Sequence, residues 1–142
     1  MQKLIIIRGI PGSGKSTYSN KMRAHLIKFG YDPNDIIQCE ADMYFEDEEG
    51  NYNWNPELLG KAHKFCFEEC KRALAAHKIA IVSNTFVDRK SIKKYAKLAE
   101  EMNAELEVYH CTGKYQNVHN VPKETVENML SNIKPWDGEI FV

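Results

Sequence analysis

The sequence predicts an α/β fold, with a parallel sheet of about four strands, helices on both faces and a short lid. Two observations lead to this prediction. Short apolar runs rich in β-branched residues alternate with longer segments of helical periodicity along the whole chain, and a glycine-rich stretch, GIPGSGKST, follows the first apolar run. Strand–helix–strand units of this kind place their strands in parallel. The 142 residues fit one domain, 1–142.

The expected strands are short and mainly apolar. The first is the kind of run that is buried on both faces of a sheet, whereas the last alternates apolar and polar positions. In chain order, the expected strands are Leu4–Arg8, 35–39, 78–84 and 104–111.

Capping residues and apolar spacing mark the expected helices. Gly30 suits a C-terminal cap and Pro56 a helix start, while Asp88 can cap the third helix and Pro122 leads into the fourth. The expected helices are Lys15–Phe29, Pro56–His77, Arg89–Met102 and Lys123–Ile133. The tail after residue 133 carries no clear signal.

Composition excludes some classes of protein. The net charge is −1 and the pI about 6.5, so no overall field attracts nucleic acid or an anionic membrane. No apolar run is long enough to span a bilayer and no signal peptide is visible, so we expect a cytoplasmic protein without a membrane partner. The four cysteines form no CxxC pair and are expected to be reduced thiols.

The glycine-rich stretch fits the phosphate-loop pattern G-x-x-x-x-G-K-S and lies between a predicted strand and a predicted helix. Its backbone N–H groups can cradle phosphates, Lys15 can reach the β and γ phosphates, and the Ser16 hydroxyl can bind Mg²⁺. The expected nucleotide-binding residues are Gly9, Pro11, Gly12, Ser13, Gly14, Lys15, Ser16 and Thr17. Because motors, switches and kinases share such a loop, it leaves the reaction open.

Asp42 follows the second predicted strand, where ligands bind in sheets of this kind. A carboxylate there can accept the proton of an attacking hydroxyl, or hold a Mg²⁺-bound water. The alternative is that Asp42 caps a helical turn over residues 44–46.

Several stretches, taken in order, resemble one family. They are GIPGSGKST, ADMYF, YNWNPELLGKAH, SNTF and NVHNVP, and they run from Gly9 to about Met129. The chain resembles the P-loop kinases typified by the kinase domain of phage polynucleotide kinase, and the kinase-like modules related to it. The resemblance implies catalytic roles for Lys15 and Asp42, and a metal site at Ser16 and Asp42. It also implies acceptor contacts at Asn84, Thr85 and Arg89, and a nucleotide contact from His119 in the lid. For His119, packing or capping before the last helix is the alternative.

The chain also departs from this family. The family usually has a carboxylate at the end of the third strand, where this chain has Ser83 and Asn84. The position of its acceptor-binding arginine is Phe45, and the lid has no arginine, only Lys114 and His119. Because a lysine does not replace an arginine on a developing charge, slow or lost activity stays an alternative.

Three further patterns allow two interpretations each. His63, Cys66 and Cys70 share a helix face, which indicates a core face rather than a zinc site. RKSIKKYAK is interpreted as an amphipathic helix with a solvated lysine face, with a nucleic-acid surface as the alternative. Four aromatic residues in the loop after Asp42 could stack on bases: Tyr44, Phe45, Tyr52 and Trp54. The four carboxylates at residues 46–49 in the same loop repel a polyphosphate backbone.

The sequence therefore predicts a Mg²⁺-dependent phosphotransferase that moves the γ-phosphoryl of ATP or GTP to a hydroxyl. The acceptor could be a polynucleotide 5′-end, a nucleoside or nucleotide, or a modified base. The alternatives are a nucleotide-binding module with little transfer activity and a small nucleoside-triphosphate hydrolase.

Overall fold

A computed structural model describes residues 2–115 and 121–142 and shows one parallel sheet. Its strand order is β2-β3-β1-β4-β5, so that β1 lies in the centre. The strands are β1 (Lys3–Arg8), β2 (Ile36–Cys39), β3 (Ile79–Asn84), β4 (Glu105–His110) and β5 (Ile140–Phe141). The α/β fold with a parallel sheet is confirmed, with one strand more than the four expected.

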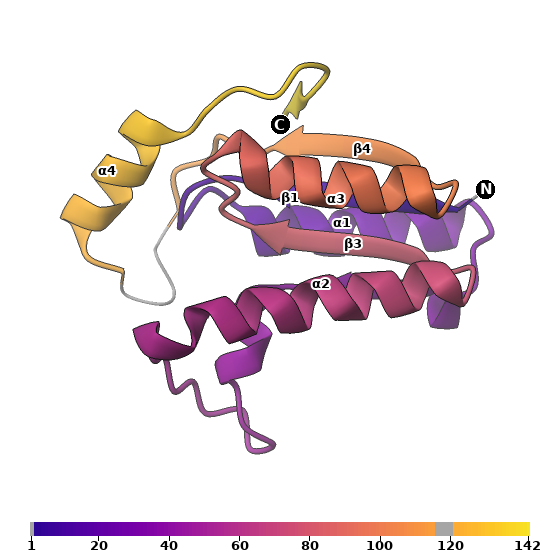
Figure 1. The fold of residues 1–142 in the computed structure, drawn as a ribbon, viewed down its shortest axis with the longest axis horizontal. Helices are drawn as coiled ribbons and strands as arrows, with labels where there is room; N and C mark the ends of the chain where they lie inside the picture. Colours follow the sequence, from indigo (N-terminus) through magenta and orange to yellow (C-terminus); the bar gives the residue numbers. More distant parts are fainter. Residues whose placement is uncertain (1, 116–120) are drawn as a thin grey trace.

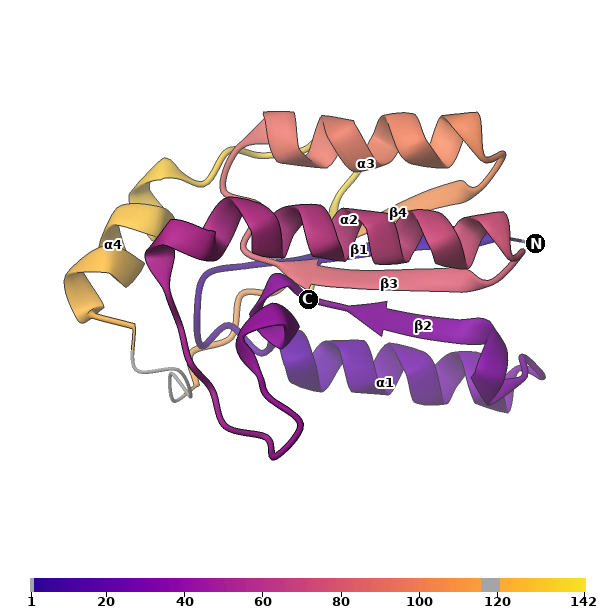
Figure 2. The ribbon, with the colours of Figure 1, turned by 60° about the horizontal axis from the view of Figure 1, so that its bottom comes forward.

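Helices cover both faces of the sheet (Figures 1 and 2). The helices α2 and α3 lie on one face and α1 lies on the other, while α4 lies beyond the carboxyl ends of the strands. Their bounds are α1 (Lys15–Lys28), α2 (Leu59–Ala75), α3 (Arg89–Glu101) and α4 (Lys123–Asn132). No helix in the described part of the chain is long and apolar enough to cross a bilayer.

Alternation along β1 builds a separate core on each face. Leu4 and Ile6 join the cluster beneath α2 and α3, whereas Ile5 and Ile7 join the cluster beneath α1. All four side chains are fully buried. A strand that is apolar at every position therefore takes the centre of the sheet, where both faces are covered.

The helix ends follow the expected capping signals. After α1, Gly30 has a φ of 104° and its N–H donates to Ile27 O, while Tyr31 N–H donates to Leu26 O. This is the pair of hydrogen bonds of a Schellman motif. At α3, Asp88 accepts a 2.9 Å hydrogen bond from the backbone N–H of Ser91.

The second helix differs from its prediction at both ends. A short 3₁₀ turn, η3 (Pro56–Leu58), comes first, and α2 begins only at Leu59 and ends at Ala75. Asn55 caps the 3₁₀ turn by accepting from the N–H of Glu57 at 3.0 Å. Pro56 therefore begins a helical turn, as expected, but one that precedes the α-helix.

The fifth strand is short and exposed, and it pairs with the end of β4. Ile140 lies opposite Tyr109, and Phe141 opposite His110. Two residues carry too little pattern to be seen in a sequence. The pairing depends instead on contacts that hold the tail against the sheet.

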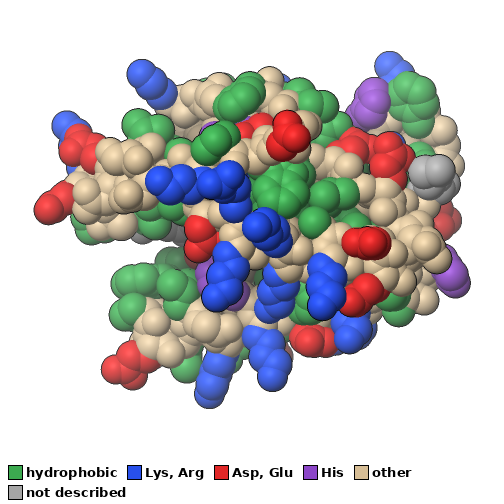
Figure 3. All heavy atoms as spheres, turned by 45° about the horizontal axis from the view of Figure 1, so that its top comes forward, with side chains coloured by type: hydrophobic (Ala, Val, Ile, Leu, Met, Phe, Trp, Pro, Cys, Tyr) green, Lys and Arg blue, Asp and Glu red, His purple; other side chains and the backbone are tan. Residues whose placement is uncertain are grey.

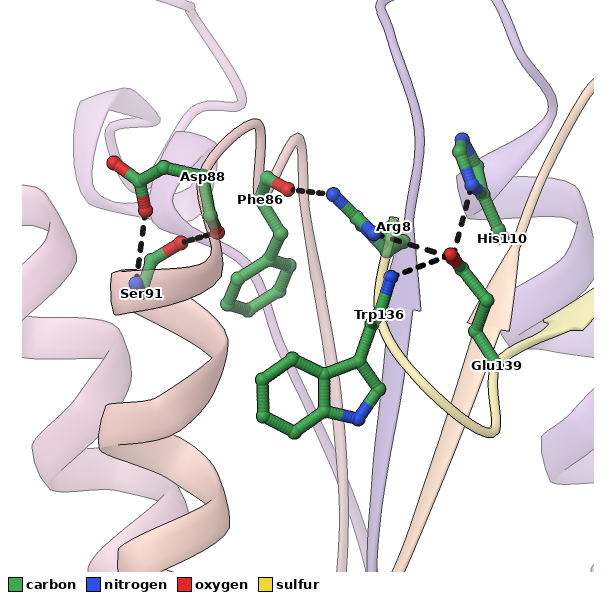
Figure 4. Close-up of polar contacts among 7 residues, drawn as sticks. All are labelled: Arg8, Phe86, Asp88, Ser91, His110, Trp136 and Glu139. Atoms are coloured by element: carbon green, nitrogen blue, oxygen red, sulfur yellow. Dashed lines mark hydrogen bonds and ion pairs between the residues drawn. The ribbon is translucent and has the colours of Figure 1, made fainter. Parts of the chain in front are cut away.

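A buried charge cluster supplies those contacts (Figure 4). Glu139 lies just before β5 and its Oε1 atom is 3.2 Å from Arg8 Nη1 and 3.0 Å from His110 Nδ1. Its other oxygen, Oε2, accepts from the backbone N–H of Trp136 at 2.7 Å. The Arg8 side chain is fully buried and also donates to the carbonyl of Phe86. The last residue of β1 is thereby joined to the C-terminal tail.

Burial has the largest effect on the pKa of both basic groups in this cluster. Burial lowers the pKa of Arg8, and Glu139 acts in the opposite direction. The pKa of His110 is lowered for the same reason, again opposed by Glu139. A carboxylate is therefore required at position 139, because a buried guanidinium without a partner is strongly destabilising.

We predict that Glu139→Gln lowers the free energy of unfolding by about 3–5 kcal/mol, because it leaves the Arg8 charge buried and without its counter-ion. Urea denaturation measures the change. Glu127→Gln serves as the control, because Glu127 forms an exposed ion pair with Lys123 at 3.8 Å. This control should cost about 0.5 kcal/mol or less. Equal effects of the two substitutions would contradict the role of Glu139.

Candidate functional site

The glycine-rich loop runs from the end of β1 to the start of α1, as the sequence predicts. Gly14 is the N-cap of α1 and has a left-handed backbone with φ 96°. A Cβ atom at Gly9 would lie 2.3 Å from Ser13 Oγ and 2.8 Å from the carbonyl oxygen of Cys111. Both positions therefore require glycine. The first N–H groups of α1 have no intrahelical acceptors and form an anion-binding end, next to the exposed residues Ser16 and Thr17.

Lys15 folds back across this loop. Its Nζ atom donates to the carbonyl of Ile10 at 3.0 Å, and the residue is half-buried. Burial lowers the pKa of Lys15, whereas Cys111, Asp42 and Glu40 act in the opposite direction. Asp42, far away in sequence, thus lies close enough to stabilise the charge of the loop lysine.

Asn84 fixes the turn that carries Asp42. This turn is η2 (Ala41–Phe45), a 3₁₀ turn directly after β2. Asn84, the last residue of β3, is buried, and its Oδ1 accepts from the backbone N–H of Ala41 at 2.8 Å. Its amide nitrogen lies 3.6 Å from the sulfur of Cys66. Asn84 thus ties the turn after β2 to the end of β3 at the carboxyl edge of the sheet.

Asp42 is half-buried within this turn, and Glu40 occupies the N-cap. The Tyr52 hydroxyl donates to Asp42 Oδ1 at 2.9 Å. The pKa of Tyr52 is raised, first by burial and then by its hydrogen bond to Asp42. An antiparallel bridge between Glu46 and Tyr52 closes the intervening loop. Tyr52, considered in the sequence as a stacking residue, thus orients the Asp42 carboxylate through its hydroxyl.

The segment after β4 packs onto the phosphate loop, which the sequence did not indicate. Gly113 N–H donates to Ser13 O at 3.1 Å, and Tyr115 N–H donates to Gly12 O at 2.7 Å. The Tyr115 ring is exposed, yet a Cβ atom on Gly14 would approach it to 2.9 Å. The beginning of the expected lid thus borders the loop and presents an aromatic ring beside it.

Other predicted positions have structural roles. Phe45, which the sequence resemblance placed where an acceptor-binding arginine was expected, is buried with Ala41 and Ala62. Ser83 is buried, and within the described residues its hydroxyl has no hydrogen-bond partner. Neither residue can contact an acceptor without rearrangement.

Three more predicted residues lie as follows. The carbonyl of Thr85 accepts from Gly9 N–H at 3.3 Å, which ties the phosphate loop to the end of β3. Arg89 is exposed at the first position of α3. His119 lies outside the described residues.

The cysteines belong to the interior, and all four lie in the described part of the chain as buried thiols outside any disulfide. Cys66 and Cys70 lie in the core beneath α2 and α3, so the core-face interpretation of their spacing is confirmed. For His63, which was expected on the same core face, the prediction is wrong: the residue is exposed and lies outside the core cluster that contains the two cysteines.

Comparisons with known proteins place this geometry in a family. A family model described as an AAA domain matches residues 4–114. The chain is 30% identical to the uncharacterized protein PM0531 of Pasteurella multocida, over all of this chain and 83% of that protein. It is 25% identical to human NEDD4-binding protein 2 over 91% of this chain, which spans only 7% of that protein.

Solved structures share the fold. The Pnkp1/Rnl/Hen1 RNA repair complex matches with a TM-score of 0.65 and 19% identity, over 93% of this chain and 44% of that one. The APS kinase CysC of Mycobacterium tuberculosis, in complex with AMPPNP and APS, matches with a TM-score of 0.57 and 13% identity, over 89% of this chain and 67% of that one. The chain therefore belongs to the AAA domain family, and its fold is that of the P-loop kinases.

Proposed function

We propose that this protein transfers the γ-phosphoryl group of ATP or GTP to a hydroxyl group of an acceptor. One observation carries the proposal: the turn with Asp42 leaves the sheet at the same edge as the phosphate loop, where Asn84 of β3 accepts from the Ala41 N–H at 2.8 Å. A module that only bound nucleotide would not need a carboxylate oriented by Tyr52 and supported by Asn84.

The phosphate loop supplies the nucleotide site. The first-turn N–H groups of α1 and the ammonium group of Lys15 bind the phosphate oxygens and neutralise their charge. The Ser16 hydroxyl would hold Mg²⁺ and the Asp42 carboxylate would accept from a water bound to it; the ion, when bound, neutralises further phosphate charge. The exposed ring of Tyr115 forms a wall beside the loop.

Asp42 supplies the base. It accepts the proton of the acceptor hydroxyl as that oxygen bonds to the γ-phosphorus, and the bond from the γ-phosphorus to the β–γ bridging oxygen breaks. The products are a phosphorylated acceptor and a nucleoside diphosphate. Acceptor contacts are expected from Thr85 and Arg89, which border the same edge of the sheet.

The second candidate is a nucleotide-binding module with little transfer activity. It is favoured by the positions of the four arginines, because three of them have partners away from the phosphate loop. Of the four, Arg8 pairs with Glu139, Arg72 pairs with Glu69, and Arg23 donates to backbone carbonyls. Arg89 alone is left for a transferred phosphoryl group within the described residues. The buried end of β3 also offers no carboxylate.

We predict that Lys15→Ala weakens the binding of ATP and GTP at least about tenfold, because a charged hydrogen bond contributes about 1.5–3 kcal/mol. Isothermal titration calorimetry measures the affinity. Lys21→Ala is the control, because Lys21 is an exposed lysine on the same helix. Unchanged affinity in a folded Lys15 variant would refute the site.

We predict that Asp42→Asn lowers phosphoryl transfer about 10²–10⁴-fold while nucleotide affinity changes little, because a base acts only in the transition state. Transfer from γ-labelled ATP and GTP is measured to a panel of 5′-hydroxyl DNA, 5′-hydroxyl RNA and nucleosides. Tyr52→Phe, which removes only the orienting hydroxyl, should reduce transfer less. Glu48→Gln is the control, since it removes an exposed carboxylate from the same loop.

Two results would argue against this role. Full transfer by Asp42→Asn would show that the carboxylate is not the base. A parallel loss of nucleotide affinity and transfer would assign Asp42 to metal binding alone. No transfer to any acceptor by the unaltered protein, with nucleotide still bound, would favour the binding module.

A further inference from the structure

Exposed lysines gather on the face of the molecule formed by α2 and α3. Figure 3 shows basic side chains in the middle and lower part of this face. The α2–α3 basic surface consists of six exposed lysines: Lys64, Lys71, Lys90, Lys93, Lys94 and Lys97.

The lysines of α3 share one side of the helix. Four of them, at positions 90, 93, 94 and 97, recur at spacings of three and four, which places them on neighbouring turns of one face. The opposite side is the buried one, with Ile92, Tyr95 and Leu98 in the core. Packing against the sheet therefore turns the lysine side outward.

Contacts between the helices bring the lysines of α2 alongside. The Phe67 ring of α2 packs edge-on against Tyr95 of α3, with centroids 5.2 Å apart, and Lys94 Nζ lies 4.3 Å above the Phe67 ring. Lys64 and Lys71 lie three residues before and four after Phe67, so they border the same seam. Residues from separate parts of the sequence thus form one surface.

The positive charge of this surface is not neutralised locally. Within residues 2–115 and 121–142, no carboxylate lies within ion-pair distance of any of the six lysines. The two helices also carry four glutamates, at positions 68, 69, 100 and 101, but basic residues outnumber them, and the exposed loop 46–49 supplies further negative charge. Burial lowers the pKa of His63, Asp42 opposes this effect, and Lys94 adds a smaller lowering.

The surroundings favour a polyanion over a membrane. A surface that adsorbs to lipid needs large apolar side chains beside its lysines. None of the exposed large hydrophobic residues among the described part of the chain belongs to α3. On α2, the exposed Leu59 is the first residue of the helix, and the exposed Phe65 lies with Tyr44 at the acidic turn, with ring centroids 5.8 Å apart.

We propose that the α2–α3 basic surface binds the sugar–phosphate backbone of nucleic acid. The 13 residues of α3 extend about 20 Å, which is the length of several nucleotides of a nucleic-acid strand. Such contacts would be electrostatic and independent of base sequence. The surface lies on the outer side of α2 and α3, and the inference does not depend on phosphoryl transfer.

The test measures salt-dependent binding to the full chain without nucleoside triphosphate. The probe is a fluorescein-labelled oligouridylate with a 5′-phosphate, which offers no 5′-hydroxyl for transfer, and fluorescence anisotropy reports its affinity across a series of KCl concentrations. We expect log K to fall with log [KCl], and Lys93→Gln/Lys97→Gln to make the slope shallower by about 1.4, since each single-strand phosphate contact contributes about 0.7.

A matched variant controls for total charge. Lys21→Gln/Lys28→Gln removes two exposed lysines from α1, on the other side of the sheet, and should leave the slope unchanged. Lys94 is retained in both variants, so its contact with Phe67 persists. Circular dichroism checks that both variants are folded.

Three results would overturn the proposal. One is no binding of the oligonucleotide by the unaltered chain at low salt. Another is equal weakening by the α1 and α3 variants, which would indicate diffuse charge. The third is binding to phosphatidylserine vesicles but not to the oligonucleotide, which would assign the surface to membranes.

Discussion

The position of β1 in the centre of a parallel sheet is the constraint on which the rest of the structure depends. Its apolar side chains alternate between the two cores, so helices must cover both faces. Because all strands run in the same direction, the phosphate loop, the Asp42 turn and the start of α3 emerge at one edge. The candidate site forms at this edge because the parallel strands bring these three segments together there.

The same strand ends in a buried charge that anchors the opposite end of the chain. Arg8 precedes Gly9, the first residue of the phosphate loop, and it pairs with Glu139 in the tail. Its donation to the Phe86 carbonyl also fixes the turn after β3, where Phe86 has the left-handed φ of 48° that is uncommon outside glycine. The cluster thus stiffens the wall behind the site and removes Arg8 from the set of residues that could contact phosphate.

Asn84 stands where the sequence resemblance predicts a carboxylate, and its side chain has a structural role. Its side-chain oxygen accepts the Ala41 N–H, and a neutral amide makes this bond without bringing a charge into the interior. A carboxylate there would carry a charge into the interior beside Cys66. The carboxylate that our proposal assigns as the base is therefore Asp42, which lies in a half-buried turn.

The sequence by itself determined the fold class, the phosphate loop and most element boundaries, because periodicity, caps and glycine spacing are local signals. It also pointed to Asp42, through its place after the second strand. Only the tertiary structure decided that Tyr52 bonds to Asp42, that Phe45 is buried, and that the tail adds a fifth strand. It also joined the lysines of α2 and α3 into one surface. These features depend on contacts between residues distant in sequence, and no local pattern of residue types encodes which pairs will meet.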